Sequence, residues 1–486
     1  MTGSIRRVGI GITVLFVALV AQLTFLQIVQ ADKLANDDRN VRNLIRDFSR
    51  PRGPILTADG EVVARSVPVD DEFGFQREYP LGPLFAHVSG YQSFVVGSTG
   101  VENSYNDELI GRDTALQLRS IENIGRALAG EQATGKVVLS ITRTLQEVAR
   151  DALGERRGSV VALDPKTGAI LAMYSNPTYD PTPLAGHNSE EVQFAFNFLN
   201  DEPSNPLLPR AYRERYAPGS TFKVVTTAIG LDAGVTTPET SYPSISELAL
   251  PLTNNTLANF GRRGCGGTLV ESFIQSCNTT FAQIGLDLGD QLAVGIDGFG
   301  VTSAAPLDLA PGATAGSGPA EGTFAQEAPQ FAFAAVGQGD AFATPLEMAL
   351  VAASVANGGV MMSPHVGAEI LDANDRHVRS IEAEPWRTVM TPTTATTLQA
   401  MMLGVVERGT GTAAQIPGVT VAGKTGTAQV PDQNPNAWFI AFAPVENPTI
   451  AIAVIVEEGG NFGSEATGGA VAAPIARDVI AAFLAP

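Results

Sequence analysis

Positive charge and metal-binding side chains are both scarce in this chain of 486 residues. The 31 Lys and Arg residues face 50 Asp and Glu residues, which gives a formal net charge of −19 at pH 7. A field of that sign repels a phosphate backbone, so nucleic acid is excluded as a partner. Four scattered His and two Cys residues cannot supply the three or four spaced ligands of a zinc site. We therefore expect neither a metal nor any other cofactor.

Glycine and proline are also too few for a low-complexity chain. The 50 Gly and 31 Pro residues stay well below about a quarter of the sequence, and 44% of the residues are hydrophobic. Disorder and collagen are excluded, and the length predicts at least two domains. Lysine is rare as well, so the places where it occurs are informative. The five lysines are Lys33, Lys136, Lys166, Lys223 and Lys424.

One long hydrophobic run lies near the amino terminus, at 8–29. It carries no charge and, as a helix, would span about 33 Å, enough to cross the hydrocarbon core once. Arg6 and Arg7 precede the run, so the positive-inside rule predicts a cytoplasmic stub at 1–7. We expect a single-pass protein of the cell membrane whose remaining chain is extracytoplasmic. A signal peptide cleaved near Ala31 is the alternative.

The expected extracytoplasmic location bears on the oxidation state of the two cysteines, Cys265 and Cys277. In an oxidising compartment they are expected to form a disulfide. The alternative is two separate buried thiols that pack as small hydrophobic residues.

Two regions that differ in amino-acid composition and pattern follow the hydrophobic run. The segment 30–135 is polar, rich in Arg and Asp, and interrupted by Gly and Pro, which predicts a small N-terminal module. From residue 136 to 486 strands and helices alternate in blocks. Thr344, Pro345 and Glu347 form the capping signature of a helix that should stop at Asn357-Gly358. Further segments are predicted as a strand pair at 158–173, strands at 419–430, 437–443 and 449–456, and a helix at 470–484.

This order predicts an α+β domain. Its first and last strands should share one antiparallel β-sheet, and helices should pack against that sheet.

The strongest chemical signal is Ser220, followed by Lys223. Pro218-Gly219 breaks the chain just before them, so Ser220 should sit in a first helical turn with Lys223 one turn later on the same face. The amine would then lie within reach of the hydroxyl. Apolar neighbours should desolvate it and lower its pKa toward that of a base. Serine and a neutral lysine can perform acyl transfer without histidine. By itself the pair is weak evidence, because an exposed helical lysine is the usual interpretation.

Two further motifs follow in order, Ser276-Cys277-Asn278 and Lys424-Thr425-Gly426. Each has a second match elsewhere in the chain. Ser104-Tyr105-Asn106 lies before the main domain, and Lys166-Thr167-Gly168 lies in a predicted hairpin turn. Lys424 instead lies in a strand of small residues that extends through Thr427, where an extended peptide could pair closely.

With these three motifs the sequence resembles the class B penicillin-binding proteins. The resemblance covers nearly the whole chain. It implies a penicillin-binding serine transpeptidase fold, preceded by a small N-terminal module and one transmembrane helix. Other segments that carry it are Arg52-Gly53-Pro54-Ile55, Gly97 to Glu102, Ala162 to Gly168, Gly337-Gln338-Gly339 and Trp438-Phe439.

The resemblance also implies a role for each motif residue. Ser220 would be the acylated nucleophile and Lys223 its base, while Ser276 would relay a proton to the leaving D-alanine. Asn278 would hold the donor peptide's amide. The remaining roles fall to the last motif: Lys424, Thr425 and Gly426 would recognise the terminal carboxylate, and the backbone N–H groups of Ser220 and Thr427 would form the oxyanion hole.

The implied reaction is D,D-transpeptidation of peptidoglycan stem peptides through an acyl-serine, a reaction that β-lactams inhibit. A β-lactamase or penicillin-sensing receptor shares the three motifs, and a catalytically silent cell-wall scaffold is the non-enzymatic alternative. The segment 30–135 is too short for a glycosyltransferase, which argues against a bifunctional synthase. The resemblance therefore implies a RodA- or FtsW-like membrane glycosyltransferase as partner.

Overall fold

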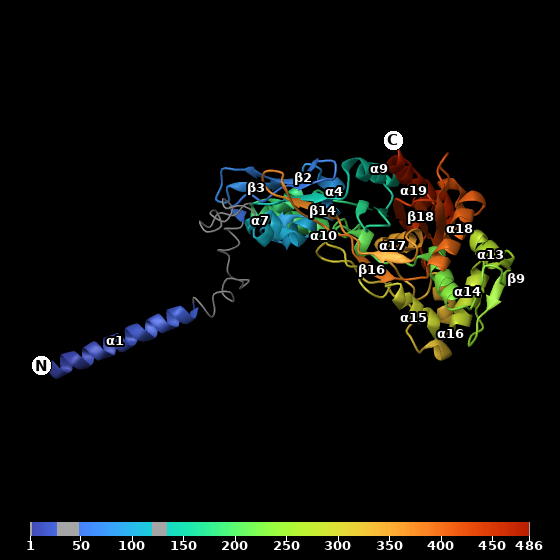
Figure 1. The fold of residues 1–486 in the computed structure, drawn as a ribbon, viewed down its shortest axis with the longest axis horizontal. Helices are drawn as coiled ribbons and strands as arrows, with labels where there is room; N and C mark the ends of the chain where they lie inside the picture. The colour runs from blue at the N-terminus through green and yellow to red at the C-terminus, as the bar shows by residue number, and fades with distance from the viewer. Residues whose placement is uncertain (1, 27–47, 119–133, 486) are drawn as a thin grey trace. The chain divides into compact units, whose positions relative to one another are not determined.

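The computed structural model describes residues 2–26, 48–118 and 134–485 (Figure 1). The chain forms two compact units. The first comprises Met1–Pro51 and Val67–Gln76, and the second comprises Arg52–Ser66 and Arg77–Pro486. The catalytic motifs all belong to the second unit.

Helix α1 (Thr2–Thr24) dominates the first unit. Its segment Arg6–Thr24 is long and apolar enough to cross a membrane, and its described side chains are exposed. The expected span at 8–29 therefore coincides with a helix as far as Thr24. The last residues of that span, from 27 on, lie outside the described part of the chain.

A five-stranded antiparallel sheet forms the core of the second unit. Its order is β17 (Ala422–Ala428), β18 (Asn436–Ala443), β19 (Ile450–Val456), β7 (Gly158–Leu163) and β8 (Ile170–Asn176). All residues of the three inner strands are buried, as expected of a sheet that helices cover on both faces. The predicted union of the first and last strands in one sheet is confirmed, and the fold class is α+β.

Helices pack against this sheet (Figure 1). Helix α19 (Gly468–Leu484) packs on β18 and β19 beside α9 (Arg143–Leu153), while α17 (Pro345–Ala356) packs against β19, β18 and β7. The predicted capping box of α17 is present. The Thr344 hydroxyl accepts the N–H of Glu347 at 3.1 Å, and the Glu347 carboxylate accepts the N–H of Thr344 at 2.7 Å.

Three further helices carry site residues, and a fourth supports them: these are α12 (Lys223–Asp232), α13 (Leu269–Gln275) and α14 (Asn278–Leu288), supported by α18 (Pro392–Arg408). Each contains several buried residues, and in α12 all residues from Lys223 to Gly230 are buried. Helix α18 lies against β17 and α13, so it supports both the strand and the helix that lead to the motifs.

A second sheet combines early and late parts of the chain. Its order is β15 (His377–Ser380), β14 (Gly367–Leu371), β6 (Lys136–Leu139), β1 (Ile55–Leu56), β2 (Val62–Pro68) and β3 (Phe75–Glu78). Strand β6 pairs parallel with β1 and antiparallel with β14. The sheet therefore continues across the boundary expected at residue 135.

Near β1, a buried carboxylate joins two buried arginines. Glu102 is fully buried and accepts hydrogen bonds from the Nε atoms of Arg52 at 3.0 Å and Arg77 at 2.6 Å. Arg52 also donates to Asn106 and to the Glu102 carbonyl. Burial is the main cause that lowers the pKa of Arg52, and the Glu102 charge opposes it. Removing this carboxylate would break both of these ion pairs and leave the buried charges less well compensated.

We expect Glu102→Gln to lower the free energy of unfolding by about 3 to 5 kcal/mol, because it breaks a buried ion-pair network from one side. Urea unfolding of the full-length protein in detergent measures this change. Glu78→Gln is the matched control: Glu78 pairs with Arg65 at the surface, where loss of the pair should cost less than about 1 kcal/mol. Equal losses in the two variants would contradict the assigned role of the buried network.

Candidate active site

Ser220 lies in a single 3₁₀ turn, Gly219–Phe222, that leads directly into α12. Residues three apart eclipse one another in a 3₁₀ helix, so Ser220 and Lys223 fall on the same side, as the sequence predicts. Gly219 has a φ of +54°, and a Cβ there would approach the Thr427 carbonyl oxygen to 2.8 Å. The glycine therefore lets the nucleophile segment lie directly against β17.

A second close approach supports the same turn. The Gly219 N–H donates to the Gly337 carbonyl at 2.8 Å, and a Cβ on Gly337 would lie 2.1 Å from the Gly219 carbonyl oxygen. On the preceding side, the indole N–H of Trp438 donates to the Ala217 carbonyl at 3.1 Å. The backbone around Ser220 is thus held from three directions.

Lys223 is fully buried, and its amine points to the second motif. Nζ lies 2.8 Å from the Ser276 carbonyl oxygen, 2.7 Å from Asn278 Oδ1 and 3.2 Å from Ser276 Oγ. Within the described chain these oxygens, and not the Ser220 hydroxyl, are its hydrogen-bond partners. Burial, with a smaller effect of the nearby Lys424 charge, holds the pKa of Lys223 well below its usual value. Burial therefore favours the neutral form of this amine.

Ser276 has an unusual backbone conformation between α13 and α14. Its φ and ψ of +64° and +43° are left-handed, a conformation that costs a residue with a Cβ on the order of 1 kcal/mol. This bend turns both its carbonyl and its hydroxyl toward the lysines. The hydroxyl also accepts a hydrogen bond from Lys424 Nζ at 2.9 Å, so it lies between two amines.

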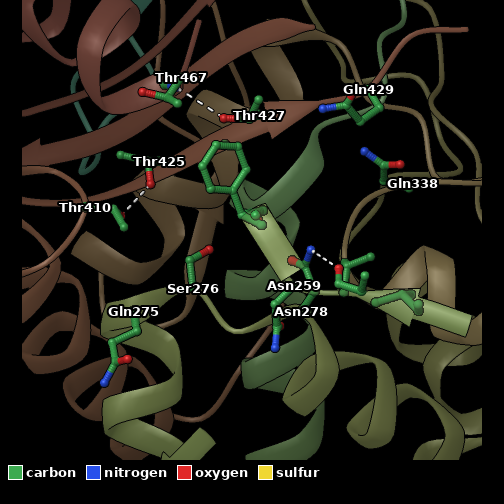
Figure 2. A pocket seen from close by; sticks show the side chains of 18 of the residues that line it. Asn259, Gln275, Ser276, Asn278, Gln338, Thr410, Thr425, Thr427, Gln429 and Thr467 are labelled. Carbon is green, nitrogen blue, oxygen red and sulfur yellow. Dashed lines mark hydrogen bonds between the residues drawn. The ribbon is translucent and has the colours of Figure 1, made fainter. Parts of the chain in front are cut away.

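Lys424 reaches this hydroxyl from the buried edge of β17. Its Nζ also donates to the Thr425 carbonyl at 3.1 Å, and burial lowers its pKa to about 7. The next side chain along, Thr425, lies 2.6 Å from the Thr410 hydroxyl, a contact that Figure 2 marks. A Cβ on Gly426 would lie 2.8 Å from the Pro218 carbonyl oxygen, so the strand also approaches the nucleophile segment closely.

Ser276, Asn278 and Thr425 border a cavity of about 960 Å³, and the two buried lysines lie behind its lining. Figure 2 shows Thr425, Thr427 and Thr467 on one side of it and Asn259 and Asn278 on the other. Ser220 and Gly426 also line the cavity. Its other lining residues include Phe260, Arg262, Gln275, Gln338, Gln429, Gly468 and Gly469.

The wall beside Asn278 is tied firmly to the second motif. A disulfide joins Cys265 to Cys277, the middle residue of the motif. The Asn278 side chain donates to the Ala258 carbonyl at 3.0 Å, and the Asn259 side chain accepts the N–H of Thr279 at 3.0 Å.

The carboxylate of Glu457 supports the segment that leads to Ser220. Glu457 follows β19 and accepts hydrogen bonds from the buried Arg210 at 2.8 Å and from the Tyr216 hydroxyl at 2.7 Å, while Arg157 contacts its other oxygen at 2.9 Å. Tyr216 in turn meets Trp438 edge to face, with ring centroids 6.0 Å apart.

The two duplicate motifs lie elsewhere. Lys166 is exposed in the turn between β7 and β8 and donates to Asn447 at 2.6 Å. Ser104 is exposed in the short helix α5 (Gly100–Ser104). Neither residue lines the cavity, so the structure selects the same motif copies as the sequence.

Several residues of the site carry no motif that sequence reasoning could use. Thr410, Asn259 and Glu457 reach it through tertiary packing, and Arg262 lies in a loop of no regular pattern. Gln338 stands within the recognised Gly337-Gln338-Gly339 segment, which was the one available signal.

Comparison with known proteins agrees with this arrangement. Residues 158–481 match the model of the penicillin-binding protein transpeptidase domain, and residues 52–138 match that of the penicillin-binding protein A dimerisation domain. The chain belongs to the penicillin-binding protein transpeptidase family. The resemblance inferred from the motifs, and the fold that it implies, are confirmed.

Relatives of this penicillin-binding protein align along its full length. Peptidoglycan D,D-transpeptidase PbpA of Mycolicibacterium smegmatis is 41% identical, with 100% of this chain and 99% of the relative covered. PbpA of Mycobacterium tuberculosis is 39% identical with the same coverage.

Two solved structures of penicillin-binding protein A from M. tuberculosis are also similar. Its ceftriaxone acyl-enzyme complex has a TM-score of 0.83 and 36% identity, covering 91% of this chain and 100% of that one. Its penicillin G acyl-enzyme complex has a TM-score of 0.80 and 37% identity, covering 90% and 100%.

Proposed function

We propose that this protein is a membrane-anchored peptidoglycan D,D-transpeptidase and a target of β-lactams. The observation that carries the proposal is the convergence of two buried lysines on one serine hydroxyl, beside a cavity that Ser220 lines. That arrangement supplies a nucleophile, a base with a lowered pKa and a retained positive charge. The named relatives are peptidoglycan D,D-transpeptidases or form acyl-enzyme complexes with β-lactams.

In the first half of the reaction, Ser220 Oγ attacks the carbonyl carbon of the D-alanyl-D-alanine bond while neutral Lys223 accepts its proton. The backbone N–H groups of Ser220 and Thr427 stabilise the oxyanion. The C–N bond then breaks. The Ser276 hydroxyl, in contact with Lys223, passes the proton to the departing amine, and D-alanine leaves.

The second half runs the same groups in reverse. An amine of a neighbouring stem peptide attacks the ester, gives its proton to Lys223, and expels Ser220 Oγ, which takes a proton back. The product is a peptide cross-link. Asn278, which accepts from Lys223 at 2.7 Å, orients that base and is placed to meet the donor's amide.

The third motif selects the substrate. A charged Lys424, with the hydroxyl of Thr425 and the close-packed backbone of Gly426, recognises the terminal carboxylate. A donor peptide lying along β17 would place its scissile carbonyl beside Ser220, because Gly219 brings the two segments together.

Replacement of the nucleophile tests the assignment. The wild-type full-length protein in detergent should gain one benzylpenicillin adduct by intact-mass spectrometry, on the peptide that contains Ser220. Ser220→Ala should gain none while it melts at a similar temperature, and Ser104→Ala, an exposed serine outside the cavity, should label normally. A stoichiometric adduct on Ser220→Ala would refute the proposal, and rapid turnover without a lasting adduct would favour the β-lactamase function.

The pH dependence of acylation should report Lys424. The proposed mechanism needs a neutral Lys223 to accept a proton and a charged Lys424 to bind a carboxylate, and burial lowers the pKa of both lysines. The rate constant with benzylpenicillin should therefore fall as the pH rises through about 7, where Lys424 becomes neutral. Lys424→Arg keeps its charge and should remove this fall up to about pH 9.

Lys166→Arg, the same change in the duplicate motif, is the control and should leave the profile unchanged. A fall that persists in Lys424→Arg would assign the titration to another group.

We also propose the topology and the partner. Residues 1–7 remain cytoplasmic, 8–29 cross the membrane, and 30–135 and 136–486 form an N-terminal module and an extracytoplasmic transpeptidase domain. The apolar helix and the two matched domain models support this division. Glycan strands would come from a RodA- or FtsW-like glycosyltransferase that contacts the membrane helix and the segment from Arg50 to Glu102.

Co-purification in detergent tests the partner. Replacing residues 8–24 with an unrelated transmembrane sequence of equal length should reduce recovery of the RodA- or FtsW-like protein several-fold, because packing between membrane helices depends on their surfaces. Benzylpenicillin labelling of both forms controls for folding. Equal recovery would refute a contact through the helix.

A further inference from the structure

Arg262 is the one charged residue among those that line the cavity in the described chain. It lies on the rim that also includes Phe260, and 75% of its side chain is exposed. The protein carries a net charge of −19, so Arg262 gives the rim of the cavity a local charge opposite in sign to that of the whole protein.

The backbone at Arg262 is fixed in an unfavourable conformation. Gly261 has a φ of +63° and Arg262 a φ of +52°. For arginine this left-handed conformation costs on the order of 1 kcal/mol, and such strain concentrates at ligand-binding positions. This turn places Arg262 among the residues that line the cavity.

The surrounding structure maintains that turn. The Asn259 side chain donates to the carbonyl oxygens of Ile245 at 2.8 Å and Arg263 at 3.2 Å, and it accepts from the Thr279 N–H. The Cys265–Cys277 disulfide anchors the chain just beyond the turn. Arg262 is therefore placed at a set position relative to the motif that contains Asn278.

Its guanidinium retains capacity for a ligand. Within the described residues, Nη1 donates at 2.8 Å to Glu247, whose side chain is 42% exposed. Guanidinium offers five N–H donors in a planar fork that matches a carboxylate. Exposed ion pairs of this kind are weak, so Glu247 orients the arginine and can share it or release it.

We propose that Arg262 forms a subsite for a second carboxylate of the acyl donor, on the acyl side of the scissile bond. This inference rests on the proposed transpeptidase function. The site is distinct from the one at Lys424, which lies on β17 and faces the donor's terminal carboxylate; Arg262 lies on the wall that continues from Asn278 through Ala258. Donors with an anionic group on their acyl portion then acylate faster than neutral or cationic ones.

Three penicillins that differ at one carbon test this subsite. Benzylpenicillin, carbenicillin and ampicillin carry hydrogen, carboxylate or ammonium, respectively, at the α-carbon of the same side chain. Acylation rate constants are measured with the full-length protein in detergent. Arg262→Gln should lower the ratio of the carbenicillin to the benzylpenicillin rate constant about fivefold, the range of one solvent-exposed ion pair, and should raise the relative rate of ampicillin.

Two further variants sharpen the result. Arg263→Gln removes an adjacent exposed arginine that does not line the cavity and should leave the ratios unchanged. Glu247→Gln removes the resident counter-ion and should raise the carbenicillin ratio about twofold.

The outcomes separate the two proposals. Absence of acylation by all three penicillins in the wild type would overturn the proposed function. Normal acylation with ratios that Arg262→Gln does not alter, or that Arg263→Gln alters equally, would overturn the subsite alone. An equal slowing of all three reactions in Arg262→Gln would make the arginine a structural element of the rim and would likewise overturn the carboxylate subsite.

Discussion

Two buried amines meet at one hydroxyl, and the arrangement of the site depends on this contact. Lys223 and Lys424 both donate to Ser276 Oγ, and no carboxylate of the described chain forms a salt bridge with either lysine. Electrostatic repulsion between two ammonium groups at such close range makes the doubly protonated state unfavourable. The site therefore favours a single positive charge shared between the two lysines, and burial lowers the pKa of both.

The surrounding structure must hold the two lysines against Ser276, because both the repulsion between like charges and the loss of hydration favour their separation. Glycine allows the backbone segments to approach one another: Gly219 contacts β17 and Gly337 with no side chain between the backbones. Covalent and charged ties supply the rest. The disulfide holds Cys277, and Glu457 holds the segment that leads through Tyr216 to Ser220. The left-handed bend at Ser276 is the local cost of directing its carbonyl and hydroxyl to the lysines.

Much of this was accessible from the sequence, and for physical reasons. The three inner strands of the central sheet are mostly apolar because helices cover both faces, and the capping box of α17 involves only residues close together in the chain. The choice between duplicate motifs followed from turn chemistry at Lys166. Local patterns do not encode partners that are distant in the chain, however. The pairing of β6 with both β1 and β14, the contact of Thr410 with Thr425, and the position of Arg262 on the rim all arise from tertiary packing.

The glycine contacts beneath Ser220 have one more consequence. A floor built of backbone against backbone admits no larger residue at Gly219, Gly337 or Gly426 without displacing the nucleophile. The rim beside Phe260 is exposed and has no such restriction. A β-lactam and the natural peptide share the chemistry of the floor but differ in what they present to the rim. Substitutions that allow one acyl donor to bind and exclude the other are therefore expected at this rim. They can change the selectivity of the protein without altering the residues at the reaction centre.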